Sequence, residues 1–125
     1  MTREYPPGYS WPAWNYGAGM TNTPLIVLCT CPDRAAADAI ATALLEAELA
    51  ACVNRIQGVE SLYRWEGRIQ EDQEILLLIK TTAAAFSEVE STVLGLHPYE
   101  LPEIIGVPVN QGSAPYLDWL TKSIR

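Results

Sequence analysis

Residues 68–81, RIQEDQEILLLIKT, decide the predicted fold because they form the second half of a long β-hairpin. Residues 51–65 form the first half, and Glu66-Gly67 is a tight-turn sequence between the two. Residues 75–79 are apolar without interruption, whereas a strand with one face in water alternates apolar and polar side chains. We therefore expect both faces of this strand to be covered, one by helices of the same chain and the other by another subunit.

Further strands and helices are predicted on both sides of this hairpin in the sequence. In chain order they are a strand at 25–30, a helix at 34–50, a helix at 83–96, a strand at 103–110 and a helix after Ser113. Asp33 is suited to cap the first helix, Pro98 should end the second, and Pro108 favours an edge position for the last strand. This order predicts an α+β, ferredoxin-like βαββαβ fold with an extra C-terminal helix, and with helices on one face of its sheet.

The composition of the chain changes near Pro24. Residues 1–23 are rich in proline, glycine and aromatic residues and predict an extended segment. This segment is either a solvated tail or an arm that packs its aromatic side chains on the body or on a neighbouring subunit. Residues 24–125 have the mixture of apolar and charged residues that is typical of one folded domain.

The charge of the chain argues against nucleic acid as a partner. With 15 acidic and 8 basic residues among 125, the net charge is −7, and a nucleic-acid-binding protein needs a basic face. No apolar run approaches the roughly 18 residues of a membrane-spanning helix, and Pro6 and Pro7 interrupt any secretory signal. We expect a cytoplasmic protein without membrane insertion, whose cysteines are reduced thiols.

Cys29-Thr30-Cys31 lies at the end of the first predicted strand. Residues i and i+2 of a strand share a face, so the two thiols should lie side by side, which suits a soft-metal site, a redox pair or a buried strand end. A redox pair is the least favoured, because thiols adjacent on a strand lack the helix-start geometry that lowers a thiol pKa in CxxC motifs. We expect a buried strand end, with Cys29 as a conditional metal ligand.

His97 is the one histidine of the chain and follows the second predicted helix. It fits either a capping or core role or a metal ligand, since thiolate and imidazole groups together bind copper or zinc. A structural zinc site would require Cys52 to converge with Cys29, Cys31 and His97. The sequence contains none of the common catalytic motifs, and we expect the protein not to be an enzyme.

A second candidate site combines aromatic and charged residues. Tyr63 and Trp65 share a strand face, and Lys80 ends the buried strand. Lys80 is placed to pair with Glu103 or to hold an anion. The alternative is a solvated lysine at a strand end beside a packed aromatic ladder.

Four stretches of the sequence resemble the CutA family of divalent-cation tolerance proteins: VLCTCPD, AELAACVNRIQGVESLYRWEGRIQEDQEILLLIKTT, LHPYELPEIIGVPVNQG and YLDWL. The resemblance runs from about Leu25 to Arg125. It implies a ferredoxin-like subunit in a tight cytoplasmic trimer similar to PII-like signalling proteins, a link to tolerance of copper and other divalent cations, and no established catalytic activity. The copper ligands that the resemblance implies are Cys29 and two adjacent histidines. Here Leu96-His97 occupies the histidine pair, and Cys31 receives no role from the resemblance.

Two hypotheses follow from these features. In the first, a homotrimer binds copper or another divalent cation through Cys29 and His97. In the second, a PII-like trimer binds a small anionic ligand or a partner protein in clefts between its subunits. The residues expected to line those clefts are Tyr63, Trp65, Lys80 and Glu103.

Overall fold

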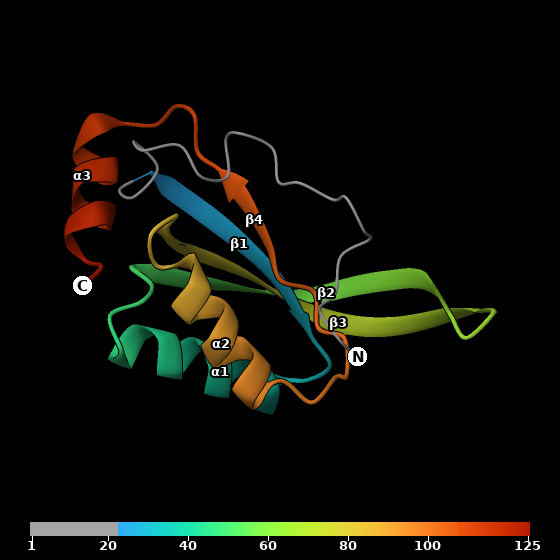
Figure 1. Ribbon diagram of the computed structural model, residues 1–125. Helices are drawn as coiled ribbons and strands as arrows, with labels where there is room; N and C mark the ends of the chain where they lie inside the picture. The colour runs from blue at the N-terminus through green and yellow to red at the C-terminus, as the bar shows by residue number, and fades with distance from the viewer. Residues whose placement is uncertain (1–22) are drawn as a thin grey trace, which may run out of the picture.

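The computed structural model describes residues 23–125, so the predicted N-terminal extension, apart from Thr23, lies outside the described residues. The helices and strands are, in chain order, β1 (Pro24–Cys31), α1 (Arg34–Glu46), β2 (Cys52–Trp65), β3 (Arg68–Thr82), α2 (Phe86–Leu96), β4 (Ile105–Pro108) and α3 (Ala114–Lys122). The strands form one antiparallel sheet in the order β2-β3-β1-β4 (Figure 1). This is the connectivity of the ferredoxin-like fold, so the predicted fold class is confirmed.

β2 and β3 form the predicted long hairpin, whose turn extends well beyond the helices (Figure 1). The turn is Glu66-Gly67, with φ angles of 52° and 76°, and positive φ at both central residues is what a two-residue type I′ turn requires. A bulge between Ile56 and Val59, with Gly58 at a φ of 81°, interrupts the pairing and increases the local twist. The predicted turn is therefore confirmed.

α1 and α2 cover one face of the sheet (Figure 1). The register of β1 on β3 pairs Val27 with Ile79 and Cys29 with Leu77, and all four side chains are fully buried. They pack in one cluster with apolar residues of both helices, namely Ile40, Leu44, Val89 and Val93. Because side chains alternate along a strand, the odd-numbered residues of β1 all lie in this core.

The opposite face of the sheet is apolar and only partly covered by this chain. It carries the even-numbered residues of β1 and the residues that pair with them across the sheet. We call five of its apolar residues the open face: Ile56, Leu76, Leu78, Ile105 and Val107. Leu76 and Leu78 are half-buried, whereas Ile105 is 51% exposed and Val107 is 44% exposed. The chain's own helices thus cover one side of the apolar run at 75–79, as predicted, and its other side faces outward.

α1 ends at Glu46 rather than at the predicted residue 50. Glu48 has a φ of 56°, its amide donates to the Leu45 carbonyl, and the Leu49 amide donates to the Leu44 carbonyl. This is the Schellman arrangement of a helix end, in which glycine usually occupies the left-handed position. A glutamate at that position gave the sequence no stop signal.

Three other local predictions are confirmed. The Asp33 carboxylate accepts a hydrogen bond from the Ala36 amide at 2.9 Å and caps α1. His97, directly before Pro98, leaves the helical region with a ψ of 135°. Pro108 lies in β4, which is an edge strand.

α2 and β4 are shorter than predicted. α2 begins at Phe86 rather than at residue 83, because the Ala83 amide donates to the Thr23 carbonyl at 2.8 Å and so continues the pairing of β1 with β3. β4 spans Ile105–Pro108 rather than 103–110 and pairs only with residues 25–28 of β1. Within residues 23–125, the second half of β1 therefore has no strand on that side.

Replacing Glu48 with glycine should stabilise the protein. A residue other than glycine costs about 1–2 kcal/mol in the left-handed region, and the greater freedom of glycine in the unfolded chain offsets about 0.4–1 kcal/mol of the gain. We expect Glu48→Gly to raise the free energy of unfolding in urea by about 0.5–1 kcal/mol. Glu46→Gly, within α1, is the control and should lower this free energy by about 0.5–1 kcal/mol. A similar loss of stability in both variants would contradict the assigned helix end.

Candidate metal centre

The candidate site lies where β1 loses its neighbour. Thr30 directs its backbone groups toward the β4 side, as Pro24 does in accepting a hydrogen bond from the Val109 amide. Because β4 pairs only with residues 25–28, the Thr30 carbonyl lies past the end of that pairing. The His97 side chain occupies this position, with Nε2 at 2.7 Å from the Thr30 carbonyl oxygen. The imidazole thus ties the end of α2 to the free edge of β1.

The hydrogen bonds of His97 fix its tautomer. Nδ1 accepts a hydrogen bond from the Tyr99 amide at 3.1 Å, so Nδ1 carries no proton. The proton is then on Nε2, which donates to the Thr30 carbonyl. The residue is only 8% exposed, and both of its nitrogens have partners. The capping role that the sequence left open for His97 is confirmed.

Cys29 and Cys31 lie side by side on the helix-covered face of β1, as the sequence predicts. Both are fully buried, and both are free thiols. The Cys29 register partner is Leu77 and the Cys31 register partner is Ile75, so the neighbouring strand β3 holds both positions. The expectation of a buried strand end is confirmed.

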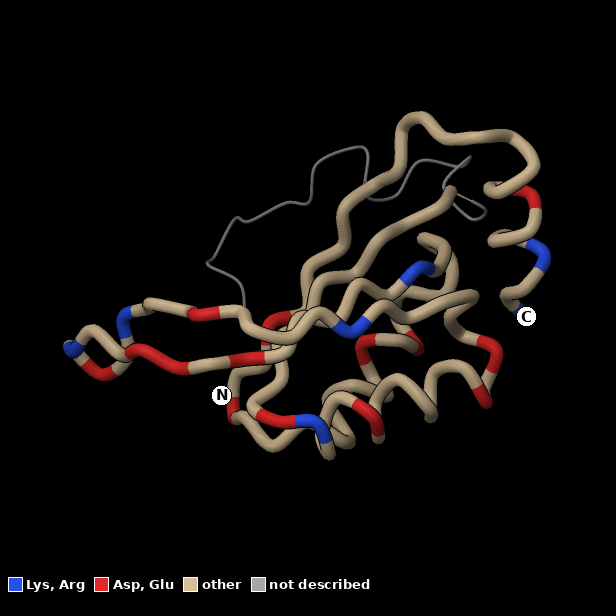
Figure 2. Tube along the Cα trace, turned by 180° about the vertical axis from the view of Figure 1, so that it is seen from behind, with Lys and Arg blue, Asp and Glu red and all other residues tan. Residues whose placement is uncertain are grey.

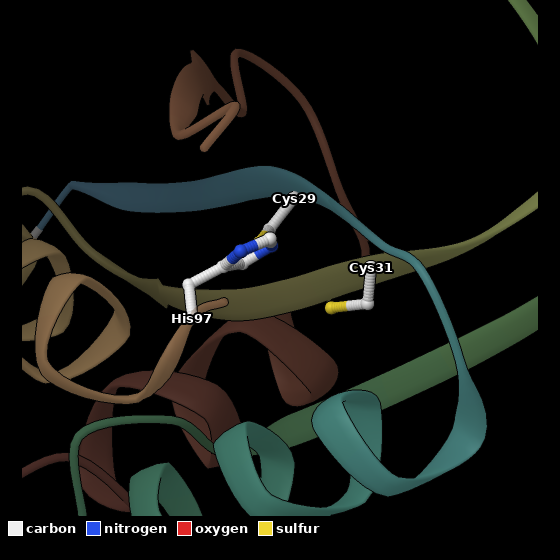
Figure 3. Close-up of side chains that lie close together, drawn as sticks. All are labelled: Cys29, Cys31 and His97. Atoms are coloured by element: carbon white, nitrogen blue, oxygen red, sulfur yellow. The ribbon is translucent and has the colours of Figure 1, made fainter. Parts of the chain in front are cut away.

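The donor atoms of Cys29, Cys31 and His97 all lie within 4.8 Å of one another (Figure 3). We call these three residues the CCH cluster. Donors around one thiophilic metal ion, with metal–sulfur bonds of about 2.3 Å and metal–nitrogen bonds of about 2.0 Å, are about 3.5–4.6 Å apart depending on the angle. Two sulfurs and one imidazole nitrogen are the donors that copper and zinc prefer. The residues present therefore fit a soft metal ion.

The two thiols titrate as a coupled pair. A hydrogen bond to Cys31, followed by burial, raises the pKa of Cys29 far above its ordinary value. The same interaction lowers the pKa of Cys31, against the effect of burial.

Two carboxylates, those of Glu74 and Glu103, lie near enough to Cys29 to influence its pKa. Glu74 is 8% exposed and accepts a hydrogen bond from the Tyr99 hydroxyl at 2.8 Å. Burial and the charge of Glu74 raise the pKa of Glu103. The charge of Glu74 also contributes to the raised pKa of Cys29 and opposes the lowering of the Cys31 pKa. A negative potential at buried thiols favours the approach of a cation.

The CCH cluster contains both metal ligands predicted from the sequence, Cys29 and His97, and one that was not predicted. Cys31 joins them, and the signal for it was the i, i+2 spacing from Cys29 on one strand. Cys52 does not converge with them, because it pairs with Lys80 on the opposite face of the sheet. The four-ligand zinc site considered from the sequence is therefore wrong for a single chain.

The four residues predicted to line a ligand cleft are spread along one subunit. Tyr63 donates a hydrogen bond to Asp72 in the long hairpin, and Trp65 adjoins the hairpin turn. Lys80 lies over the ring of Tyr116 in α3, with its Nζ 5.6 Å from the ring centroid. These positions do not form one cleft within the subunit, since Lys80 lies about 33 Å along β3 from the register partner of Tyr63.

Glu103, the fourth of these residues, precedes β4 and adjoins Glu74 rather than Lys80. A cleft completed by a neighbouring subunit stays a prediction.

The surface charge of the described residues suits cations better than anions. Acidic positions are spread along the long hairpin and the helices, and basic positions are fewer (Figure 2). None of the helices within residues 23–125 has the length and apolar character needed to cross a membrane.

The comparisons with known proteins agree on one family. The family model described as CutA1 divalent ion tolerance protein matches residues 25–123. The divalent-cation tolerance protein CutA of Thermus thermophilus is 50% identical over 98 residues, which cover 78% of this chain and 95% of that protein. Protein CutA of Homo sapiens is 41% identical over 121 residues, which cover 96% of this chain and 68% of that protein.

Solved structures of such proteins have the same fold. The Thermus thermophilus divalent cation tolerance protein Cut A1 superposes with a TM-score of 0.80 at 48% identity, covering 82% of this chain and 99% of that chain. The Archaeoglobus fulgidus protein, named as the periplasmic divalent cation tolerance protein CutA, superposes with a TM-score of 0.79 at 34% identity, again covering 82% and 99%. The sequence match and the shared fold together establish that this chain belongs to the CutA1 family of divalent ion tolerance proteins.

Proposed function

We propose that this protein contributes to divalent-cation tolerance by binding metal ions, copper in particular, at the CCH cluster. The observation that carries the proposal is the convergence of three soft donors within 4.8 Å in a buried site. The names of its relatives support the same role, since they are divalent-cation tolerance proteins. The proposed role is binding rather than catalysis.

Chemistry favours copper or zinc over the hard divalent cations. Thiolate and imidazole ligands select soft or borderline metal ions, whereas magnesium and calcium require oxygen ligands. Sulfur and nitrogen supply the donor atoms of the CCH cluster, and its carboxylate neighbour Glu74 is engaged by the Tyr99 hydroxyl. We further propose that the protein works in the cytoplasm, because its free thiols persist most readily in a reducing compartment.

Metal binding can be measured on protein purified without a metal-affinity tag. We expect anaerobic titration with Cu(II) and Zn(II) to give saturable binding near one ion per chain. Loss of a residue that only supports a metal ligand weakens metal binding by about 10–100-fold. Cys29→Ser removes a direct ligand and should weaken binding by more than this. Cys52→Ser is the matched control, because Cys52 lies on the opposite face of the sheet, and it should bind as the wild type does. Equal binding by the wild type and Cys29→Ser would refute the site.

His97 should also stabilise the metal-free protein. Truncating its side chain leaves the Thr30 carbonyl and the Tyr99 amide without their partner. A buried polar group left unsatisfied costs about 1–3 kcal/mol, so His97→Ala should lower the free energy of unfolding by about 2–4 kcal/mol in urea with a chelator present. His97→Gln, whose amide both donates and accepts, should recover part of this loss. Unchanged stability of His97→Ala would show that the imidazole does not cap β1.

We propose that the protein is a homotrimer assembled through the open face. Its partly exposed apolar side chains support this proposal, since a soluble monomer rarely leaves a contiguous apolar face in water. The opposite face of the sheet cannot form the interface between subunits, because α1 and α2 already cover it.

A charge on the open face should disrupt the assembly. Light scattering of the wild type should give a mass near three times 13.8 kDa, and Leu78→Lys should shift the protein toward a single chain because it places a buried charge between subunits. Leu45→Lys on the exposed side of α1 is the control and should leave the mass unchanged. A wild-type mass of one chain would overturn the proposed trimer.

A further inference from the structure

The two thiols and the imidazole of the CCH cluster are not equivalent donors. Both nitrogens of His97 already have hydrogen-bond partners, so a metal ion reaches one of them only by displacing the Tyr99 amide or the Thr30 carbonyl. The sulfurs of Cys29 and Cys31 make only weak hydrogen bonds, because a thiol is a poor hydrogen-bond donor. Among the described residues, the Cys29 sulfur approaches the Thr30 carbonyl at 3.9 Å, and the two thiols hydrogen-bond to each other.

We propose that Cys29 and Cys31 together are the primary ligands of a monovalent thiophilic ion, Cu(I), and that His97 is a weak third donor. This inference rests on the proposed metal-binding function. Cys31 thereby becomes a principal ligand rather than a core residue. The proposal assigns the site a different ion class from a divalent cation held by one thiolate and imidazole.

The geometry of the sulfurs suits this ion. With metal–sulfur bonds of about 2.3 Å, a linear S–Cu–S unit spans about 4.6 Å and a bent one spans less. The sulfurs lie within 4.8 Å of each other, so two-coordinate binding needs little movement. Zinc, in contrast, takes four ligands in structural sites, and the CCH cluster offers three among the described residues.

The surroundings of the thiols also suit a small ion of low coordination number. Cys29 and Cys31 are fully buried. A metal ion bound between them would therefore lie away from water, whereas a divalent ion would need water molecules as additional ligands. β3 pairs with both residues, so the two sulfurs are held by a continuous backbone ladder. On binding, both thiols lose their protons to the solvent, and the two thiolates coordinate one Cu(I).

The surface next to Cys31 is hollowed, although Cys31 itself is fully buried. A hollow of about 310 Å³ is lined in part by Pro32, Arg34, Glu74 and Ile75. Pro32 follows Cys31 in the chain, and Ile75 is its register partner. Glu74, whose carboxylate accepts a hydrogen bond from the Tyr99 hydroxyl, also lines this hollow. The hollow thus has one acidic side chain, Glu74, and one basic side chain, Arg34.

The test is a Cu(I) competition titration of the reduced, metal-free full chain against a chromogenic Cu(I) chelator under anaerobic conditions. The wild type should take up one Cu(I) per chain. Cys31→Ser and Cys29→Ser should each weaken binding by about 100-fold or more, and His97→Gln by less than about 10-fold. Cys52→Ser is the matched thiol control and should match the wild type.

X-ray absorption of the copper-loaded wild type gives a second readout that does not depend on how the variants fold. Two sulfur neighbours per copper would support the proposal, and one sulfur with nitrogen neighbours would overturn it. Cys31→Ser with wild-type Cu(I) affinity would overturn it as well. A third outcome separates this inference from the proposed function. If the wild type and Cys31→Ser bind Cu(II) or Zn(II) with equal affinity, and the wild type binds Cu(I) only weakly, this inference fails while the proposed function stands. If the wild type binds none of the three ions, both fail.

Discussion

The hydrogen bond between His97 and the Thr30 carbonyl joins the two halves of the fold at the point where the sheet is incomplete. β4 pairs with only the first half of β1, and an unpaired backbone carbonyl near the core would cost free energy. The imidazole satisfies that carbonyl at 2.7 Å and is itself held by the Tyr99 amide. The short length of β4 therefore places His97 beside β1, and beside the two thiols that β1 carries.

The alternation of side chains along β1 then separates two roles. Odd-numbered residues, including Cys29 and Cys31, point to the helix-covered face, whereas even-numbered residues point to the open face. A one-residue slip of β1 on β3 would exchange these sets. The register that builds the proposed metal site is thus the same register that gives the open face its apolar character. We infer that mutations that weaken this pairing would affect both properties together.

Much of the fold could be predicted from the sequence because its signals are local. The Glu66-Gly67 turn, the Asp33 cap and the stop at Pro98 each depend on a few adjacent residues. The end of α1 could not be predicted, because Glu48 occupies a left-handed position that glycine normally marks. The site too could be predicted only in part. The i, i+2 spacing predicted that the two thiols lie side by side. Their convergence with His97 depends on where β4 ends, and Thr30 and His97 are 67 residues apart in the sequence.

The donor set of the CCH cluster follows from which residues are free to act. Leu96 precedes His97 at the end of α2, so His97 supplies the one imidazole there. Cys31 supplies a further donor from β1, a strand held by β3. Two sulfur donors on one paired strand make the set softer and more rigid than one sulfur donor with nitrogen donors at a helix end. A soft, rigid and buried donor pair discriminates by ion size and polarisability more than by charge, which favours a thiophilic ion in a family named for divalent cations.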